Sequence, residues 1–158
     1  MYKHREDLTH LVPHHSAVES VSMDEKGSLS LTLSNGPWVT DKHPRNPYGA
    51  PARTDKACLL FEEVATLWED IPDSFALHIL WNAQKSGRRS ARTVSGYPDI
   101  TDYIMSSRAA LDLTDLFERK GFFLLRGKIA LPTGKAGDFF WEIPATRLLC
   151  LWNDLCPQ

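Results

Sequence analysis

The sequence predicts an α+β protein, with a mixed or mainly antiparallel sheet of about five strands and three to four helices packed on it. Two stretches alternate apolar and polar residues around a glycine-containing turn, which is the pattern of a β-hairpin. Other segments repeat apolar residues at helical spacing. The 158 residues suffice for one core, so we expect a single domain over residues 1–158.

The first third of the chain is predicted to contain an arm, a hairpin and a long connection. Residues 1–16 include four of the six histidines and have weak periodicity, which indicates a mobile N-terminal arm. Residues 18–33 alternate around the turn DEKG, as expected for a hairpin with one buried face. Residues 40–54 contain three prolines and should form an irregular connection. Arg45 and Tyr48 make this connection a candidate contact site.

Residues 54–72 show the clearest helical pattern. Thr54 or Asp55 is a suitable N-cap, and Pro72 would end the helix. One stripe at i, i+3, i+4, i+7 spacing is apolar: Ala57, Leu60, Phe61, Val64, Ala65 and Trp68. The other side carries four candidate partner-binding acids: Glu62, Glu63, Glu69 and Asp70.

The second half of the chain is predicted to contain strands and helices in alternation. Residues 74–82 are apolar on both faces, which is typical of a central strand. Helical segments are expected over 99–104 and 113–121. A second hairpin is expected over 122–143. Thr146 would cap a last helix, whose stripe is Leu148, Leu151, Trp152 and Leu155.

A basic stretch, KSGRRSARTVSGY at residues 85–97, follows the predicted central strand and resembles a mobile connection. Its four cations are Lys85, Arg88, Arg89 and Arg92. Ion pairs with the acidic helix would contribute only ~0–1 kcal/mol each. Nucleic-acid binding through residues 85–92 is disfavoured because the net charge of −2 leaves −6 on the chain outside these four cations, which would repel a long polyanion. A partner protein of mixed charge fits this charge distribution better.

No motif in the chain identifies a catalytic site. The stretch GKIALPTGKAG has the wrong glycine spacing for a phosphate-binding loop and joins two predicted strands. Pro13 breaks any helix that would align His10 with His14 as zinc ligands, so we expect no metal and no cofactor. His78 is expected to be an ordinary sheet histidine.

The three cysteines are expected to remain free thiols. They are odd in number and none belongs to a C-x-x-C pair. Cys58 and Cys150 lie in apolar stripes, where burial would raise the thiol pKa. The N-terminus lacks the apolar core of a secretory signal, and no apolar run is long enough to span a bilayer. We therefore expect a cytoplasmic protein that contacts no membrane.

These observations favour a non-catalytic protein-binding module, most simply an inhibitor or immunity-type protein that neutralises its partner by occlusion. Trp38 and Tyr97 would be aromatic anchors. The acidic residues would contact a basic partner such as a nuclease, and the basic stretch would contact an acidic one. Two alternatives stay open: a nucleic-acid-associated regulator that uses residues 85–92, and a small hydrolase or metal-dependent enzyme that uses the histidines.

Overall fold

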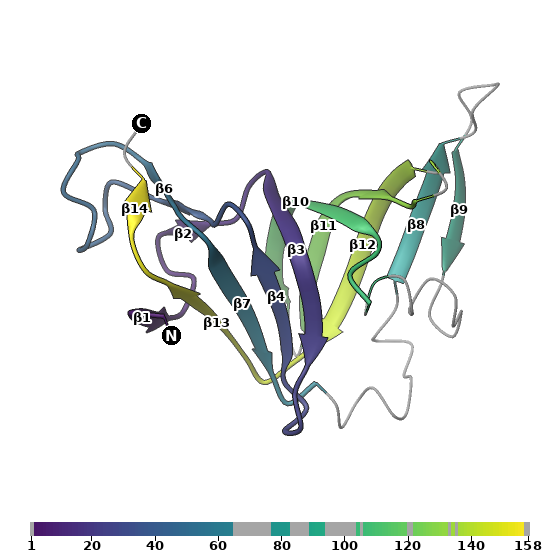
Figure 1. Ribbon diagram of the computed structural model, residues 1–158, viewed down its shortest axis with the longest axis horizontal. Helices are drawn as coiled ribbons and strands as arrows, with labels where there is room; N and C mark the ends of the chain where they lie inside the picture. Colours follow the sequence, from purple (N-terminus) through teal and green to yellow (C-terminus); the bar gives the residue numbers. More distant parts are fainter. Residues whose placement is uncertain are drawn as a thin grey trace.

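The protein is built from antiparallel strands (Figure 1). The computed structural model describes residues 2–64, 77–82, 89–93, 104, 106–119, 122–132, 134 and 136–156. The predicted α+β class is wrong, because every element within these ranges is a strand and none is a helix. The described residues form one sheet of ten strands and another of four, in place of the expected sheet of about five strands with helices on it.

Every strand of both sheets pairs with its neighbours in antiparallel fashion. The strands of the large sheet, in spatial order, are β1 (His4–Glu6), β13 (Arg147–Trp152), β7 (Ala57–Glu62), β4 (Leu29–Leu33), β3 (Ser16–Met23), β10 (Ala110–Arg119), β11 (Phe122–Ala130), β12 (Ala136–Pro144), β8 (Leu77–Asn82) and β9 (Arg89–Thr93). Those of the small sheet are β14 (Leu155–Cys156), β6 (Ala52–Thr54), β5 (Trp38–Val39) and β2 (Leu11–Val12).

Both predicted hairpins are confirmed. Strands β3 and β4 pair on either side of the turn at Gly27, and β11 pairs with β12 along its whole length. The predicted strand over residues 74–82 is found as β8, which lies between β12 and β9. Residues 89–93 of the basic stretch, expected in a mobile connection, form β9 at the edge of the large sheet.

Three predicted helices are strands instead. Residues 57–62 form β7, residues 110–119 form β10 and residues 147–152 form β13. Strands β7 and β13 bury apolar side chains on both faces, so the polar–apolar alternation that identifies a strand is lost. The expected helix over 99–104 lies outside the described residues except at its last position.

Within the expected arm over residues 1–16, residues 4–6 and 11–12 are hydrogen-bonded into the two sheets. Strand β1 pairs with β13, so that His4 lies opposite Trp152. Strand β2 pairs with β5, so that Val12 lies opposite Trp38. The N-terminal segment therefore joins the large sheet to the small one.

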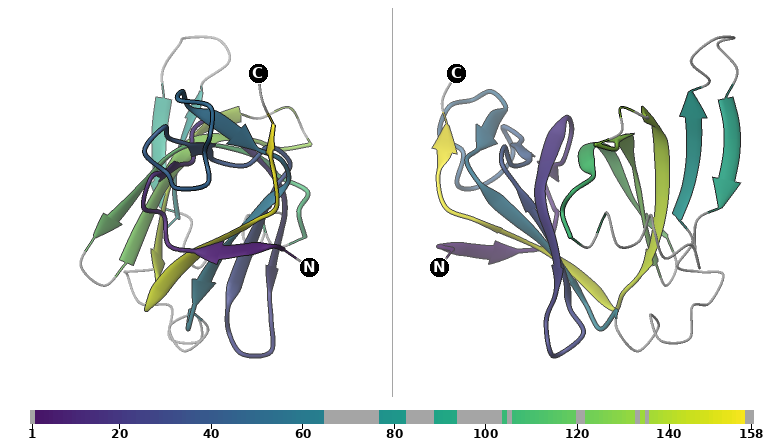
Figure 2. Two further views of the ribbon diagram at one scale, coloured as in Figure 1. Left: turned by 90° about the vertical axis from the view of Figure 1, so that its left-hand side faces the viewer. Right: turned by 45° about the vertical axis from the view of Figure 1, so that its right-hand side comes forward.

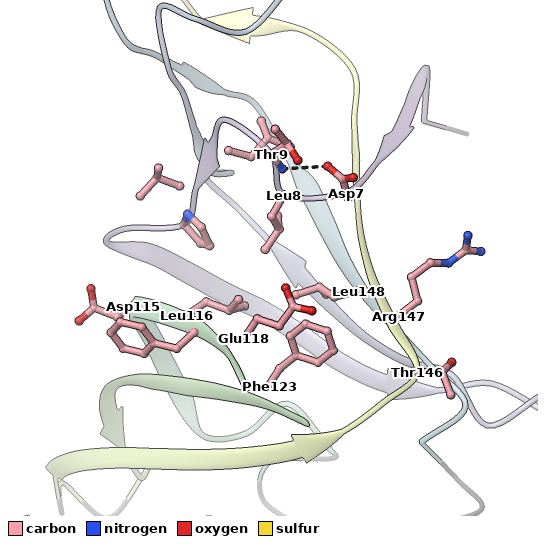
Figure 3. A pocket seen from close by; sticks show the side chains of 14 residues that line it. Asp7, Leu8, Thr9, Asp115, Leu116, Glu118, Phe123, Thr146, Arg147 and Leu148 are labelled. Atoms are coloured by element: carbon pink, nitrogen blue, oxygen red, sulfur yellow. Dashed lines mark hydrogen bonds between the residues drawn. The ribbon is translucent and has the colours of Figure 1, made fainter. Parts of the chain in front are cut away.

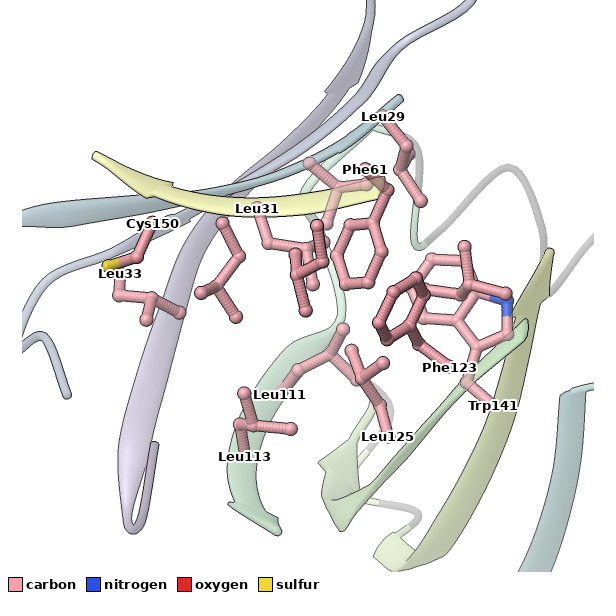
Figure 4. Close-up of a cluster of buried hydrophobic side chains, with 14 of the residues drawn as sticks. Leu29, Leu31, Leu33, Phe61, Leu111, Leu113, Phe123, Leu125, Trp141 and Cys150 are labelled. Atoms are coloured by element: carbon pink, nitrogen blue, oxygen red, sulfur yellow. The ribbon is translucent and has the colours of Figure 1, made fainter. Parts of the chain in front are cut away.

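The core lies between two parts of the strongly bent large sheet (Figure 2). Side chains from β4 and β7 point toward those of β10, β11 and β12 (Figure 4). The rings of Phe61 and Phe123 meet edge to face, with centroids 5.8 Å apart. Trp141 and Trp152 are completely buried. Burial of each such side chain contributes roughly 1.5–3 kcal/mol to stability.

Candidate functional site

A pocket of about 740 Å³ opens at one end of this core (Figure 3). Its walls come from three parts of the chain: residues 7–13, which we call the N-terminal strap, the end of β10 with Phe123 of β11, and residues 146–148 at the start of β13. Phe123 and Leu148 also belong to the core cluster. The floor of the pocket is therefore the surface of the core itself.

The N-terminal strap is held in shape by local hydrogen bonds. The backbone N–H of Thr9 donates to Oδ1 of Asp7 at 2.9 Å, and that of Leu11 donates to the carbonyl of Leu8 at 3.0 Å. His10 adopts a positive φ of 63°, which turns the chain into β2. Because β2 pairs with β5, the strap is fixed to the small sheet.

A β-bulge shapes the opposite wall of the pocket. The register between β10 and β11 shifts after Leu113, so that Thr114 is the extra residue. The Thr114 hydroxyl donates to the carbonyl of Arg126 at 2.9 Å, and Nδ1 of His14 hydrogen-bonds to the Thr114 carbonyl at 3.0 Å. The shift places Leu116 opposite buried Leu125, on the face of the sheet toward the core.

Exposed apolar side chains gather at the mouth of the pocket. Within the described part of the chain, the large hydrophobic residues with high exposure are Val12 at 48%, Tyr48 at 52% and Phe117 at 41%. Val12 on the strap and Phe117 on β10 both line this pocket. Two of these three side chains therefore flank one opening, which is typical of a contact surface.

Among the residues that the structure describes, four charged side chains line the pocket, and two of them form ion pairs with neighbours. Asp115 pairs with Arg126 at 2.7 Å. Arg147 directs Nε to Glu62 at 3.0 Å, and Figure 3 shows its side chain pointing away from the pocket. Because Asp115 and Arg147 are each balanced by an opposite charge, they contribute little net charge to the opening.

Asp7 and Glu118 supply the remaining charge. The hydrogen bonds from Thr9 hold the pKa of Asp7 below its usual value, so this carboxylate is ionised at neutral pH. Glu118 forms no ion pair with any residue that the structure describes. The described lining is therefore apolar with an acidic character.

Of the ten partner-binding residues predicted from the sequence, the structure describes five: Trp38, Glu62, Glu63, Arg89 and Arg92. Trp38 is half-buried in β5, and the guanidinium of Arg53 stacks over its ring at 4.9 Å. Glu62 lies on β7 and pairs with Arg5 and Arg147, while Glu63 follows it with a positive φ.

Two further predicted contact residues lie in the edge strand of the large sheet. Arg89 and Arg92 belong to β9, where Arg89 lies opposite Asn82 and Arg92 opposite Ile79. Five predicted residues lie outside the described residues: Lys85, Arg88, Tyr97, Glu69 and Asp70.

The connection over residues 40–51 is ordered by one buried amide. The Asn46 side chain donates to the carbonyls of Val39, Thr40 and Ala50 at 2.9–3.1 Å, and it accepts from the backbone N–H of Tyr48. Tyr48 is thereby presented to solvent on a fixed backbone, as expected of a candidate contact residue. Arg45 is also exposed, and its Nε lies 3.9 Å from Glu6.

His43 belongs to a hydrogen-bonded group with Glu6 and Trp152. Nε2 of buried His43 lies 2.5 Å from Oε1 of Glu6, and the N–H of Arg45 donates to its Nδ1, so that Nε2 carries the proton. The other oxygen of Glu6 accepts from the Trp152 indole at 3.1 Å. In the described ranges, no three His, Cys, Asp or Glu side chains gather closely enough to hold a metal ion.

The three cysteines are free, and two of them are buried. Burial raises the pKa of the Cys58 thiol. Burial, together with the nearby Glu6 carboxylate, raises the pKa of Cys150 to about 12. The predicted inertness of these two thiols therefore has a physical basis, although they lie on strands and not on helices.

Comparison of the chain with protein-family models, with curated proteins and with solved structures gives no match. Among the described residues, no helix has the length and apolarity to cross a bilayer. The candidate site therefore has to be interpreted from its own geometry.

Sequence reasoning missed the strap and Glu118. The sequence predicts a helix over 113–121 because Leu113, Leu116 and Phe117 have helical spacing. The β-bulge at Thr114 instead brings Leu113 and Leu116 to the same face of a strand, while Phe117, opposite Leu124, lies on the other face. The alternation of Leu111 with Leu113, just before the bulge, was the available signal.

Proposed function

We propose that this protein is a non-catalytic binding module that acts as an inhibitor or immunity-type protein, and that it docks a segment of its partner in the pocket between the strap and β10. The supporting observation is the concentration of exposed apolar side chains, Val12 and Phe117, at a pocket whose floor is continuous with the core.

The arrangement suits binding by shape and burial. A partner side chain that enters the pocket would cover apolar surface of Leu8, Leu116 and Phe123, at about 25 cal/mol per Å² of apolar area removed from water. The walls are held by β-pairing and by the hydrogen bonds of the strap, so little ordering entropy is lost on binding. Anchors at the centre of a rigid pocket are typical of tight protein interfaces.

Occlusion follows from the same geometry. A partner segment held by Val12 and Phe117 would be withdrawn from its own substrate without any chemical step. We place this activity in the cytoplasm, in line with the free thiols of the three cysteines.

Site-directed photo-crosslinking in the native cell tests this proposal. A benzophenone amino acid at position 12 should give one discrete protein adduct, because this side chain lies at the opening. The matched control is the same amino acid at Glu25, an exposed position in the turn between β3 and β4. A second variant, Phe117→Ala, should lower the yield of the adduct at position 12 several-fold. Equal adducts from positions 12 and 25, or a yield unchanged by Phe117→Ala, would contradict the proposal.

A further inference from the structure

We infer that the segment bound in this pocket presents a basic side chain, lysine or arginine, between apolar neighbours, and that Glu118 selects it. The inference rests on the proposed function, since it names the chemistry of the docked segment. The observation behind the inference is the position of the Glu118 carboxylate in the sheet.

Strand geometry directs Glu118 toward the pocket. Glu118 is the register partner of Phe123, which is buried in the core. Side chains directly opposite one another on paired strands point to the same face of the sheet. Glu118 therefore extends from the face that carries Leu116 and Phe123, and Figure 3 shows its side chain directed between Phe123 and Leu148.

The surroundings of Glu118 lack a compensating cation within the part of the chain that the structure describes. Arg147, which is the one basic residue among the described residues of the lining, is held by Glu62 at 3.0 Å and points away. Asp7, on the strap across the pocket, adds a second negative charge. A ligand at this opening thus meets an acidic potential over an apolar floor.

Ligand binding would remove water from the Glu118 carboxylate. In the free protein this side chain is exposed and hydrated. A purely apolar ligand that covered the opening would remove that hydration and leave a charge unpaired, which is costly. A lysine or arginine would pair with the carboxylate while its methylene stem packs against Leu116 and Phe123, which lie on the same face of the sheet. Charge and apolar surface therefore favour the same class of ligand.

The experiment is a selection of short random peptides on the immobilised full chain, followed by measurement of Kd by fluorescence anisotropy. Selected peptides should contain lysine or arginine flanked by apolar residues. Each should be compared with an analogue in which the basic residue is replaced by norleucine. The protein variants are Glu118→Gln, Phe117→Ala and, as a control remote from the pocket, Glu25→Gln.

If Glu118 pairs directly with the basic residue, the double-mutant cycle that combines Glu118→Gln with the norleucine analogue should show a coupling energy. Glu118→Gln should weaken the basic peptide by up to about five-fold at low salt and leave the norleucine analogue nearly unchanged. Glu25→Gln should change neither.

The other outcomes separate the inference from the function on which it rests. Peptides that bind wild type and Glu118→Gln equally, but are weakened by Phe117→Ala, would refute the basic ligand and keep the pocket as the docking site. A failure to select any peptide, or binding that neither Glu118→Gln nor Phe117→Ala affects, would refute both.

Discussion

Glu62 and Arg147 are register partners across β7 and β13, and the carboxylate of the first accepts a hydrogen bond from Nε of the second at 3.0 Å. The same carboxylate accepts a hydrogen bond from Arg5 at 2.9 Å. The acid predicted to contact a partner is thus occupied by two arginines of its own chain, and one of them borders the pocket. This relationship gives the first stability prediction.

Replacement of Glu62 by Gln should lower the free energy of unfolding by about 1 kcal/mol at neutral pH, because both arginines are largely exposed and screened. The hydrogen bond from Arg147 lowers the pKa of Glu62 below 4.5 in the folded state. This contribution is therefore complete above the unfolded pKa and is lost as pH falls through the folded one. Urea titrations from neutral to acidic pH should show a shallower acid destabilisation in the variant. An unchanged pH profile would contradict this prediction.

The Cys150 thiol should destabilise the fold at alkaline pH. Its folded pKa is about 12 against 9.0 in the unfolded chain, so its contribution is complete below pH 9.0 and is lost as pH rises through about 12. The slope within that interval should approach 1.4 kcal/mol per pH unit. Stability measured against pH should lose this slope in Cys150→Ala and keep it in the control Cys156→Ala, since Cys156 is exposed. The same slope in all three proteins would rule out Cys150 as its source.

Gly127 in β11 should tolerate replacement less well than Gly134. A Cβ at this position would lie 2.0 Å from the carbonyl oxygen of Asp112 and 2.9 Å from Phe139. Gly127→Ala should therefore cost about 3 kcal/mol of stability, since both neighbours are held in the sheet. At Gly134 a Cβ would meet open space and only the positive φ is unfavourable, so Gly134→Ala should cost about 1–2 kcal/mol. Thermal unfolding of the two variants tests the order, and equal losses would contradict it.

Asn46 should be the main support of the connection over residues 40–51. Asn46→Ala removes the partner of three carbonyls and of one backbone N–H, which should cost about 2–3 kcal/mol. Tyr48→Ala, at the exposed tip, should change stability by less than about 0.5 kcal/mol. Limited proteolysis should cut the connection faster in Asn46→Ala only. Comparable cutting of both variants would show that the amide does not hold this segment.

The sequence predicts the hairpins well and the rest of the fold poorly, for physical reasons visible in particular residues. In β4, Leu29, Leu31 and Leu33 are buried while Ser30 and Thr32 are half-buried, so alternation reports the strand directly. In β13, three consecutive residues from Leu148 to Cys150 are all buried, and such a run is equally compatible with a helix. The spacing of apolar residues therefore identifies a helix or strand only when one of its faces is exposed to solvent.

The sequence does not predict the pocket residues, for a related reason. Glu118 faces the pocket because of its register with Phe123, and register depends on pairing between strands, which local spacing does not encode. Val12 and Leu8 line the pocket because β2 pairs with β5, a contact between segments far apart in sequence. A site assembled from such pairings becomes visible only with the topology.

The position of β13 between β1 and β7 has a consequence for biosynthesis. Both neighbours leave the ribosome well before residues 147–152, so neither can complete its pairing there until this late strand emerges. During translation, the apolar β7 keeps one backbone edge available to other nascent chains. Chaperone capture and aggregation of stalled polypeptides should therefore concentrate on this edge.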